Sequence, residues 1–155
     1  SRENDPVFIQ SFEVGNLKAL AKKTDIRLVQ LVASEGGPPD RDGETYASML
    51  TPDGLKEIAT YAAGLGPSKE LVIGRNALGQ LGRPSGLVDA AHKAGLLVHP
   101  WTFRAENHFL PIDFKGGLDP RDSGDLAGEI QAFLAAGVDG LFSDHPGMAI
   151  AVSNR

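Results

Sequence analysis

The residues best able to do chemistry lie in short polar or aromatic clusters, each of which follows an apolar run. The clearest cluster is His99-Pro100-Trp101-Thr102-Phe103-Arg104, which follows Leu96-Leu97-Val98. A histidine can act as an acid or base near neutral pH, a tryptophan offers a ligand an apolar wall, and an arginine can bind phosphate. Gln10-Ser11-Phe12 and Ser143-Asp144-His145 follow two further apolar runs. These clusters predict where a ligand would be bound.

Each candidate also has a purely structural interpretation, and the sequence leaves both open. Trp101 either borders a ligand or covers the core. His99 is either an acid–base group or, as we favour, a hydrogen-bonded interior side chain. Arg104 either contacts phosphate or pairs with Glu106 on the same loop. Asp144 either takes part in catalysis or caps the helix that follows it.

Composition excludes several classes of protein and site. The 155 residues include no cysteine, which excludes disulfides, thiolate metal sites and cysteine nucleophiles. The net charge is -5, and no basic patch with interleaved aromatics is present, so nucleic acid is not an expected partner. No apolar run is long enough to span a membrane. No metal cluster and no complete catalytic motif is visible, so the residues by themselves predict a site without a complete catalytic set.

Apolar patterns and breaker residues predict strands that alternate with helices. Strands are expected at 7–12, 26–32, 65–67, within 95–104 and at 138–143, and helices at 14–23, 51–62, 85–94, 123–136 and 146–152. Thr51 and Ser123 are the expected N-caps of two helices. Residues 71–73 fit either a short strand or a helical turn.

About five such alternations, with strands that are apolar on both faces, favour a parallel sheet. The connections from helix to strand are short, but two from strand to helix, 33–50 and 104–122, are long. Long loops at the C-terminal ends of parallel strands are typical of functional sites in α/β folds. If side chains alternate regularly along the strand, His99, Trp101 and Phe103 share one face there.

Five stretches occur together in the order and with the spacing of a known family. They are Phe8-Ile9-Gln10-Ser11-Phe12, Leu28-Val29-Gln30-Leu31-Val32, Tyr61-Ala62-Ala63-Gly64-Leu65-Gly66-Pro67, Val98-His99-Pro100-Trp101-Thr102-Phe103-Arg104 and Gly137-Val138-Asp139-Gly140-Leu141-Phe142-Ser143-Asp144-His145-Pro146. The chain resembles the C-terminal part of a glycerophosphodiester phosphodiesterase of the longer bacterial periplasmic and plant type. The resemblance implies a TIM-barrel fold, of which residues 1–155, as part of a single domain, hold about the last five β/α units.

The resemblance also implies a function. The family hydrolyses glycerophosphodiesters to glycerol 3-phosphate and an alcohol, using a Ca²⁺ or Mg²⁺ ion and acid–base histidines. The motifs that carry those histidines and the acidic ligands are absent from this sequence, so we expect the chain alone to be inactive. By motif match, Phe12 and Trp101 are expected to form apolar walls near the glycerol moiety. Arg104 is a weaker candidate for a phosphate contact.

The sequence also leaves two alternative functions open and leads to expectations about association and location. The alternatives are a small non-catalytic α/β module that binds a phosphorylated ligand, and another barrel enzyme such as a sugar isomerase. The first and last expected strands would be apolar sheet edges, so we expect pairing with a missing N-terminal half of the barrel, or self-association. The resemblance favours a periplasmic or secreted location, although no signal peptide is visible in this segment.

Overall fold

A computed structural model describes residues 5–153 of the chain, with the side chain of residue 153 left out. The elements along the chain are β1 (Phe8–Ser11), α1 (Val14–Leu20), β2 (Arg27–Val32), α2 (Tyr46–Met49), α3 (Pro52–Ile58), β3 (Gly64–Pro67), α4 (Lys69–Val72), β4 (Ile73–Arg75), β5 (Leu81–Pro84), α5 (Leu87–Lys93), β6 (Leu97–Val98), the 3₁₀ turn η1 (Ile112–Phe114), α6 (Leu126–Ala135) and α7 (Pro146–Ser153). No helix in this part of the chain is both long and apolar enough to cross a membrane.

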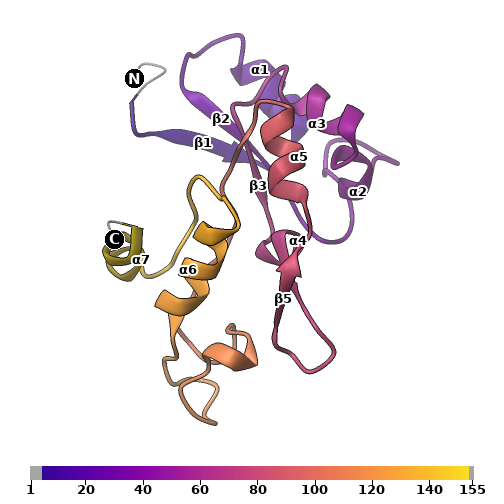
Figure 1. The fold of residues 1–155 in the computed structure, drawn as a ribbon. Coiled ribbons are helices and arrows are strands. Elements are labelled where there is room, and N and C mark those ends of the chain that lie inside the picture. The colour runs from indigo at the N-terminus through magenta and orange to yellow at the C-terminus, as the bar shows by residue number, and fades with distance from the viewer. Residues whose placement is uncertain (1–4, 154–155) are drawn as a thin grey trace.

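Four parallel strands form the main sheet in the order β1-β2-β3-β6, which follows the order of the chain (Figure 1). Each crossover between neighbouring strands passes through at least one helix. β2 is buried along almost its whole length, as its apolar sequence on both faces predicts. The α/β fold with a parallel sheet is therefore as expected.

The two faces of β2 pack against different surroundings. Leu28 and Val32 belong to the main hydrophobic core together with residues of α1, α3 and α5. Val29 and Leu31 lie on the opposite face, where a Cβ atom on Gly66 of β3 would come within 2.6 Å of Leu31. Because Gly66 has no side chain, Val29 and Leu31 of β2 can occupy the space next to it on this face of the sheet.

The expected fifth strand at 138–143 is not a regular strand. It runs parallel to the chain after β6, joined by the bridge between Phe103 and Ser143. The amide N–H groups of Asp139 and Gly140 both donate to the carbonyl of Val98, and the amide of Val98 donates to the Asp139 carboxylate at 2.8 Å. A side chain thus takes the place of a backbone acceptor, which interrupts the regular strand pairing.

Several helix boundaries differ from those expected. Thr51 caps α3 as predicted, through a 3.2 Å hydrogen bond from the amide of Gly54. α3 ends at Ile58, before the expected end at residue 62, and Gly64 begins β3. α6 is capped by Asp125, not Ser123, because the Asp125 carboxylate accepts from the amide of Gly128 at 2.8 Å. Ser123 instead forms an antiparallel bridge with the long segment at residue 106.

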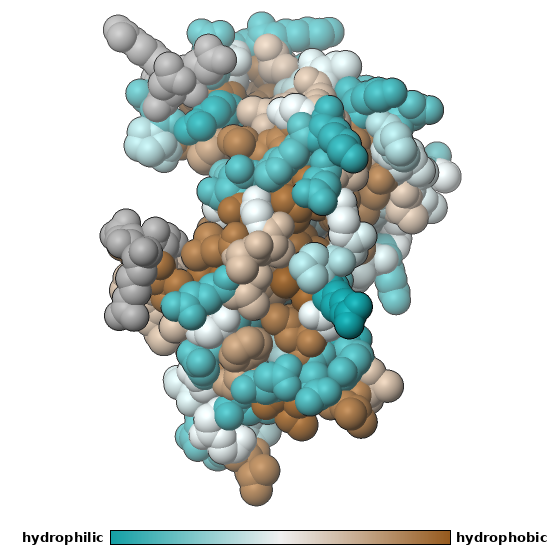
Figure 2. All heavy atoms as spheres, viewed as in Figure 1, coloured by the Kyte–Doolittle hydropathy of each residue, from teal (hydrophilic) through white to brown (hydrophobic). Residues whose placement is uncertain are grey.

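The regions left undecided or assigned to loops contain short elements. Residues 71–73 cover the end of α4 and the first residue of β4, which pairs with β5 as a hairpin. The 33–50 connection contains α2, and the 104–122 segment contains η1. In Figure 1 the hairpin and the 104–122 segment extend from the same end of the molecule, away from α1 and α3. Figure 2, in the same view, shows hydrophobic residues exposed between hydrophilic ones along the middle of the molecule.

Candidate functional site

Phe12 and Trp101 meet at the C-terminal edge of the sheet. Phe12 directly follows β1, and Trp101 lies three residues beyond β6. Their ring centroids are 5.7 Å apart in an edge-to-face arrangement, and Tyr46 of α2 lies 6.0 Å from Phe12. Parallel strands end at one edge of a sheet, so residues 89 positions apart in sequence become neighbours.

Trp101 is held in place by hydrogen bonds to the end of β3. Its indole Nε1 donates to the carbonyl of Gly66 at 2.8 Å. Its amide donates to the carbonyl of Pro67 at 3.1 Å, and its carbonyl accepts from the amide of Lys69 at 2.9 Å. The Trp101–Thr102 peptide bond is cis. The hydrogen bonds of Trp101 make its indole a fixed wall, and the bond to Gly66 of β3 sets the orientation of the ring.

A cavity of about 400 Å³ opens beside this wall, and we call it the inner pocket. Its boundary includes Gln10, Phe12, Leu31, Trp101, Phe142 and Asp144. The lining combines aromatic surfaces with a few polar groups, as is typical of small-molecule sites. All of these residues belong to, or closely follow, strands or strand-like segments of the sheet.

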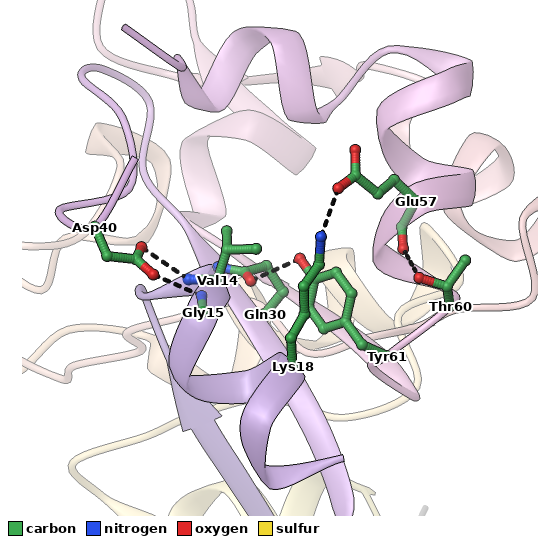
Figure 3. Close-up of polar contacts among 8 residues, drawn as sticks. All are labelled: Val14, Gly15, Lys18, Gln30, Asp40, Glu57, Thr60 and Tyr61. Carbon is green, nitrogen blue, oxygen red and sulfur yellow. Dashed lines mark hydrogen bonds and ion pairs between the residues drawn. The ribbon is translucent and has the colours of Figure 1, made fainter. Parts of the chain in front are cut away.

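Gln30 of β2 holds the backbone at Phe12 through its side-chain amide. This residue was not among the candidates selected from the sequence. Its side chain is fully buried. Its amide nitrogen lies 3.3 and 3.2 Å from the carbonyls of Ser11 and Phe12, and its carbonyl accepts from the Tyr61 hydroxyl at 2.9 Å (Figure 3). The only sequence signal for it was that Gln30 is the single polar residue among the five residues 28–32 of this strand.

His99 has an interior position. Its ring makes edge-to-face contacts with Phe8 at 4.9 Å and Phe142 at 6.3 Å. A Cβ atom on Gly140 would approach the His99 ring to 2.9 Å, so the ring is closely packed. Burial lowers the pKa of His99, although the nearby Asp139 carboxylate acts to raise it. The ring is thus closely packed and half-buried, whereas the hydrogen bond expected for an interior His99 is not found among the described residues.

Side chains do not continue to alternate regularly between the two faces of the strand as far as residue 103. Phe103 is fully buried, and its ring packs edge-to-face on Phe133 of α6 at 4.9 Å. It therefore lies among the helices, whereas Trp101 lies at the inner pocket. The expectation that His99, Trp101 and Phe103 share one face is wrong at Phe103. The reason is that β6 ends at Val98 and the chain beyond it makes only isolated bridges.

Arg104 forms an ion pair with Asp144, which directly follows residues 138–143, and not with Glu106. Its Nε donates to the Asp144 carboxylate at 2.6 Å, and its guanidinium lies 4.6 Å from the centre of the Phe109 ring. Glu106 instead approaches His145, with 3.6 Å between the nitrogen and oxygen atoms. Asp144 thus has an ion-pair partner as well as its position just before α7.

A second cavity of about 400 Å³, the outer pocket, shares Trp101 and Thr102 with the inner pocket. Its other lining residues include Lys69, Arg75, Arg104, His108 and Phe109. Lys69 was not anticipated from the sequence, since nothing in Ser68-Lys69-Glu70 marks it as buried. No signal in the sequence identified this pocket.

Beneath the outer pocket lies a buried ion pair between α4 and α6. The Nζ of Lys69 donates to the Glu129 carboxylate at 2.7 Å, and the two side chains are 7% and 1% exposed. The second Glu129 oxygen is buried and has no hydrogen-bond partner among the described residues. Burial raises the pKa of Glu129, and Lys69 opposes that change. This pair joins two elements that are 60 positions apart.

Metal ligands do not gather in this part of the protein. Within residues 5–153, no three His, Cys, Asp or Glu side chains are arranged to hold a metal ion. The carboxylates nearest the inner pocket have other partners, since Asp144 binds Arg104. Among the described residues, the inner pocket is therefore lined by aromatic and polar side chains without a cluster of metal ligands.

Comparison with known proteins gives the family. The model of the glycerophosphoryl diester phosphodiesterase family matches residues 1–148. Glycerophosphodiester phosphodiesterase GDPD6 of Arabidopsis thaliana is 34% identical over 142 residues, which are 92% of this chain and 36% of that protein. A glycerophosphodiester phosphodiesterase of Treponema pallidum is 30% identical over 119 residues, 66% of this chain and 33% of that protein. The chain thus spans about a third of these relatives.

Solved structures support the fold. A protein of Agrobacterium tumefaciens assigned as a glycerophosphoryl diester phosphodiesterase matches with a TM-score of 0.55 and 20% identity, over 94% of this chain and 42% of that one. A similarly assigned protein of Silicibacter pomeroyi matches with a TM-score of 0.56 and 21% identity, over 94% and 37%. These neighbours are TIM barrels, of which this chain covers a part. The chain belongs to the glycerophosphoryl diester phosphodiesterase family.

Proposed function

We propose that this chain forms the substrate wall of a phosphodiesterase that hydrolyses glycerophosphodiesters to glycerol 3-phosphate and an alcohol. The observation that carries the proposal is the Phe12–Trp101 corner at the C-terminal edge of the parallel sheet, beside the inner pocket. Barrel enzymes place their sites at this edge. The match to the family over residues 1–148 supports the reaction class, and gives no support to a sugar isomerase.

In this proposal the inner pocket binds the glycerol end of the substrate. The carbon backbone of glycerol lies against the rings of Phe12 and Trp101, which exclude water from one side. Because Trp101 is fixed by its bonds to Gly66 and Pro67, little ordering is needed when the ligand binds. In the hydrolysis itself, a water oxygen bonds to phosphorus and gives up a proton, the phosphorus–oxygen bond to the alcohol breaks, and the departing oxygen takes up a proton.

The family generally depends on a divalent cation. The described residues do not fit such an ion, because no suitable group of three ligands converges among them. We therefore assign this chain no step that involves the ion. We propose that Ca²⁺ or Mg²⁺, and the groups that transfer protons, are held outside the described residues, and that the 155-residue chain alone does not hydrolyse the substrate.

The β1 edge of the sheet also supports a proposal about association. β1 is at one end of the strand order, and Val7 just before it is 45% exposed. An exposed strand edge is a template for further pairing. We propose that the preceding strands of a longer barrel pair here, and that the isolated chain self-associates through the same edge. Sedimentation velocity should show concentration-dependent dimers; a monomer at every concentration would contradict this.

The function is tested by assaying release of glycerol 3-phosphate from glycerophosphocholine with added Ca²⁺ or Mg²⁺. We expect no release by the 155-residue chain, and release by a longer protein that contains it. In the longer protein, Trp101→Ala should lower kcat/KM by about 10-fold or more, since it removes the fixed wall. Measurable metal-dependent hydrolysis by the short chain would overturn its assigned inactivity. A longer protein without hydrolytic activity would overturn the function.

A further inference from the structure

The inner and outer pockets are adjoining parts of one surface. Trp101 and Thr102 line both cavities. Arg104 lines the outer pocket and Asp144 the inner one, and their 2.6 Å ion pair connects the two rims. A ligand that extends past the edge of Trp101 would therefore pass from one pocket into the other.

The outer pocket is richer in positive charge than the inner one. Lys69, Arg75 and Arg104 line it together with the carboxylate of Glu70, and Lys69 and Arg104 are also paired with Glu129 and Asp144. Arg75 donates to the carbonyl of Phe109 at 2.5 Å, a neutral acceptor, and no carboxylate among the described residues forms an ion pair with it. Arg104 uses only its Nε on Asp144, so the rest of its guanidinium fork is available to a ligand.

These cations are held in position before any ligand arrives. The carbonyl of Phe109 accepts from both Lys69, at 3.2 Å, and Arg75. The ring of Phe109 lies under the guanidinium of Arg104. Lys69 is anchored in turn by Glu129. One residue of the 104–122 segment thus sets the spacing of all three cations, and preorganised cations bind an anion with little loss of side-chain freedom.

We infer that the outer pocket is the subsite for the alcohol headgroup, and that it favours headgroups bearing a second phosphate. The inference rests on the proposed function. A glycerophosphodiester has two organic groups on one phosphate, so glycerol against Phe12 and Trp101 directs the other group across the shared wall. There, a phosphate meets Arg75 and Arg104, whereas the trimethylammonium of a choline headgroup meets like charge.

The chain contains a direct reporter for the test, because Trp101 is its single tryptophan and lines both pockets. Its fluorescence can be titrated with glycerophosphoinositol and glycerophosphoinositol 4-phosphate, which differ only by the second phosphate. We expect the 4-phosphate to bind the 155-residue chain about 10-fold more tightly, and glycerophosphocholine to bind more weakly than either. Inorganic phosphate and glycerol 3-phosphate serve as separate titrants for the two ends of the ligand.

Two variants from one hairpin separate a specific contact from general attraction. Arg75→Gln should reduce the preference for the 4-phosphate to about 2-fold or less. Arg83→Gln removes the same charge from β5, where Arg83 is exposed and does not line the outer pocket, and it should leave the preference intact. Both substitutions are at exposed positions, so loss of folding is not expected.

Each other outcome has a distinct meaning. Equal affinity for the two inositol ligands, or equal effects of the two variants, would overturn the headgroup subsite while leaving the proposed function intact. Tight binding of inorganic phosphate with no gain from the glycerophosphoinositol portion would show a free anion site and would also overturn the inference. No saturable change with any ligand, glycerol 3-phosphate included, would overturn the subsite, whereas the proposed function is decided separately by the hydrolysis assay of the longer protein.

Discussion

The inner pocket is built from residues at the ends of sheet strands, whereas the outer pocket is built from α4, β4 and the 104–122 segment. Neutral hydrogen bonds to backbone carbonyls hold the inner wall, as at Trp101 and Gln30. Charged groups hold the outer one, with the Lys69–Glu129 pair beneath it. The difference indicates that changes in charge should damage the outer pocket most, and that loss of neutral hydrogen bonds should damage the inner one.

The largest effect is expected from Lys69→Met. It leaves the Glu129 carboxylate buried without a cation, so we expect the free energy of unfolding to fall by about 3–5 kcal/mol. Urea denaturation followed by circular dichroism measures this. Replacing both partners, in Lys69→Met with Glu129→Leu, should recover a large part of the loss, because no buried charge then remains.

A matched control for this change is Lys18→Met. Lys18 and Glu57 also form a 2.8 Å ion pair, but their side chains are 34% and 55% exposed (Figure 3). An exposed pair contributes about 0–1 kcal/mol. Similar losses for the two lysine variants would contradict the claim that the pair beneath the outer pocket depends on burial.

A smaller effect is expected from Gln30→Leu, on the inner side. The change removes the side-chain donor near the carbonyls of Ser11 and Phe12, and the acceptor of the Tyr61 hydroxyl. Leaving buried polar groups unsatisfied costs about 1–3 kcal/mol, again measured by urea denaturation. Tyr61→Phe removes only the last of these bonds and should cost less. An unchanged stability in Gln30→Leu would show that these bonds do not support the wall.

Protonation of His99 should make the free energy of unfolding depend on pH, with an effect smaller than that of Gln30→Leu. Its folded pKa lies below the unfolded value of 6.5, so well above pH 6.5 the ring is neutral in both states and adds no pH dependence to stability. As pH falls below 6.5, the unfolded chain binds the proton first. Stability therefore falls until pH reaches the folded pKa, by about 1.4 kcal/mol for each unit between the two pKa values.

The measurement for His99 is the difference in unfolding free energy between wild type and His99→Gln from pH 7.5 to 4.5. Taking the difference removes the contribution of carboxylates that titrate in both proteins. We expect the wild type to lose more stability than the variant over this range. Parallel curves for the two proteins would show that the His99 pKa is the same in the folded and unfolded states.

The smallest change in stability is expected from Arg104→Gln. The Arg104–Asp144 pair is 39% and 54% exposed, so its loss should change the free energy of unfolding by no more than about 1 kcal/mol. The same variant should weaken binding of a phosphate-bearing headgroup in the fluorescence titration. A loss of stability as large as that of Lys69→Met would place Arg104 among the structural groups of the outer pocket.

The sheet and the inner wall could be predicted because they follow local rules. An apolar strand that is buried on both faces, as in Arg27–Val32, predicts a parallel sheet, and parallel strands bring their C-terminal ends to one edge. That rule brought Phe12 and Trp101 into the same predicted region. The prediction of a regular strand at 138–143 was wrong. The amide of Val98 donates a hydrogen bond to the Asp139 carboxylate, and this contact between residues distant in the sequence could not be predicted from local patterns.

The sequence alone determined the fold class, the edge of the sheet where we propose that ligands bind, and the family, because strand periodicity and short motifs are written in neighbouring residues. Only the tertiary structure decided which charges are buried and which residues share a cavity. Lys69 and Glu129 look like ordinary surface residues in the sequence, and Arg104 has an acidic residue two positions away that it does not use. Their partners are 60 and 40 positions distant, and packing of α6 and the 104–122 segment brings them together.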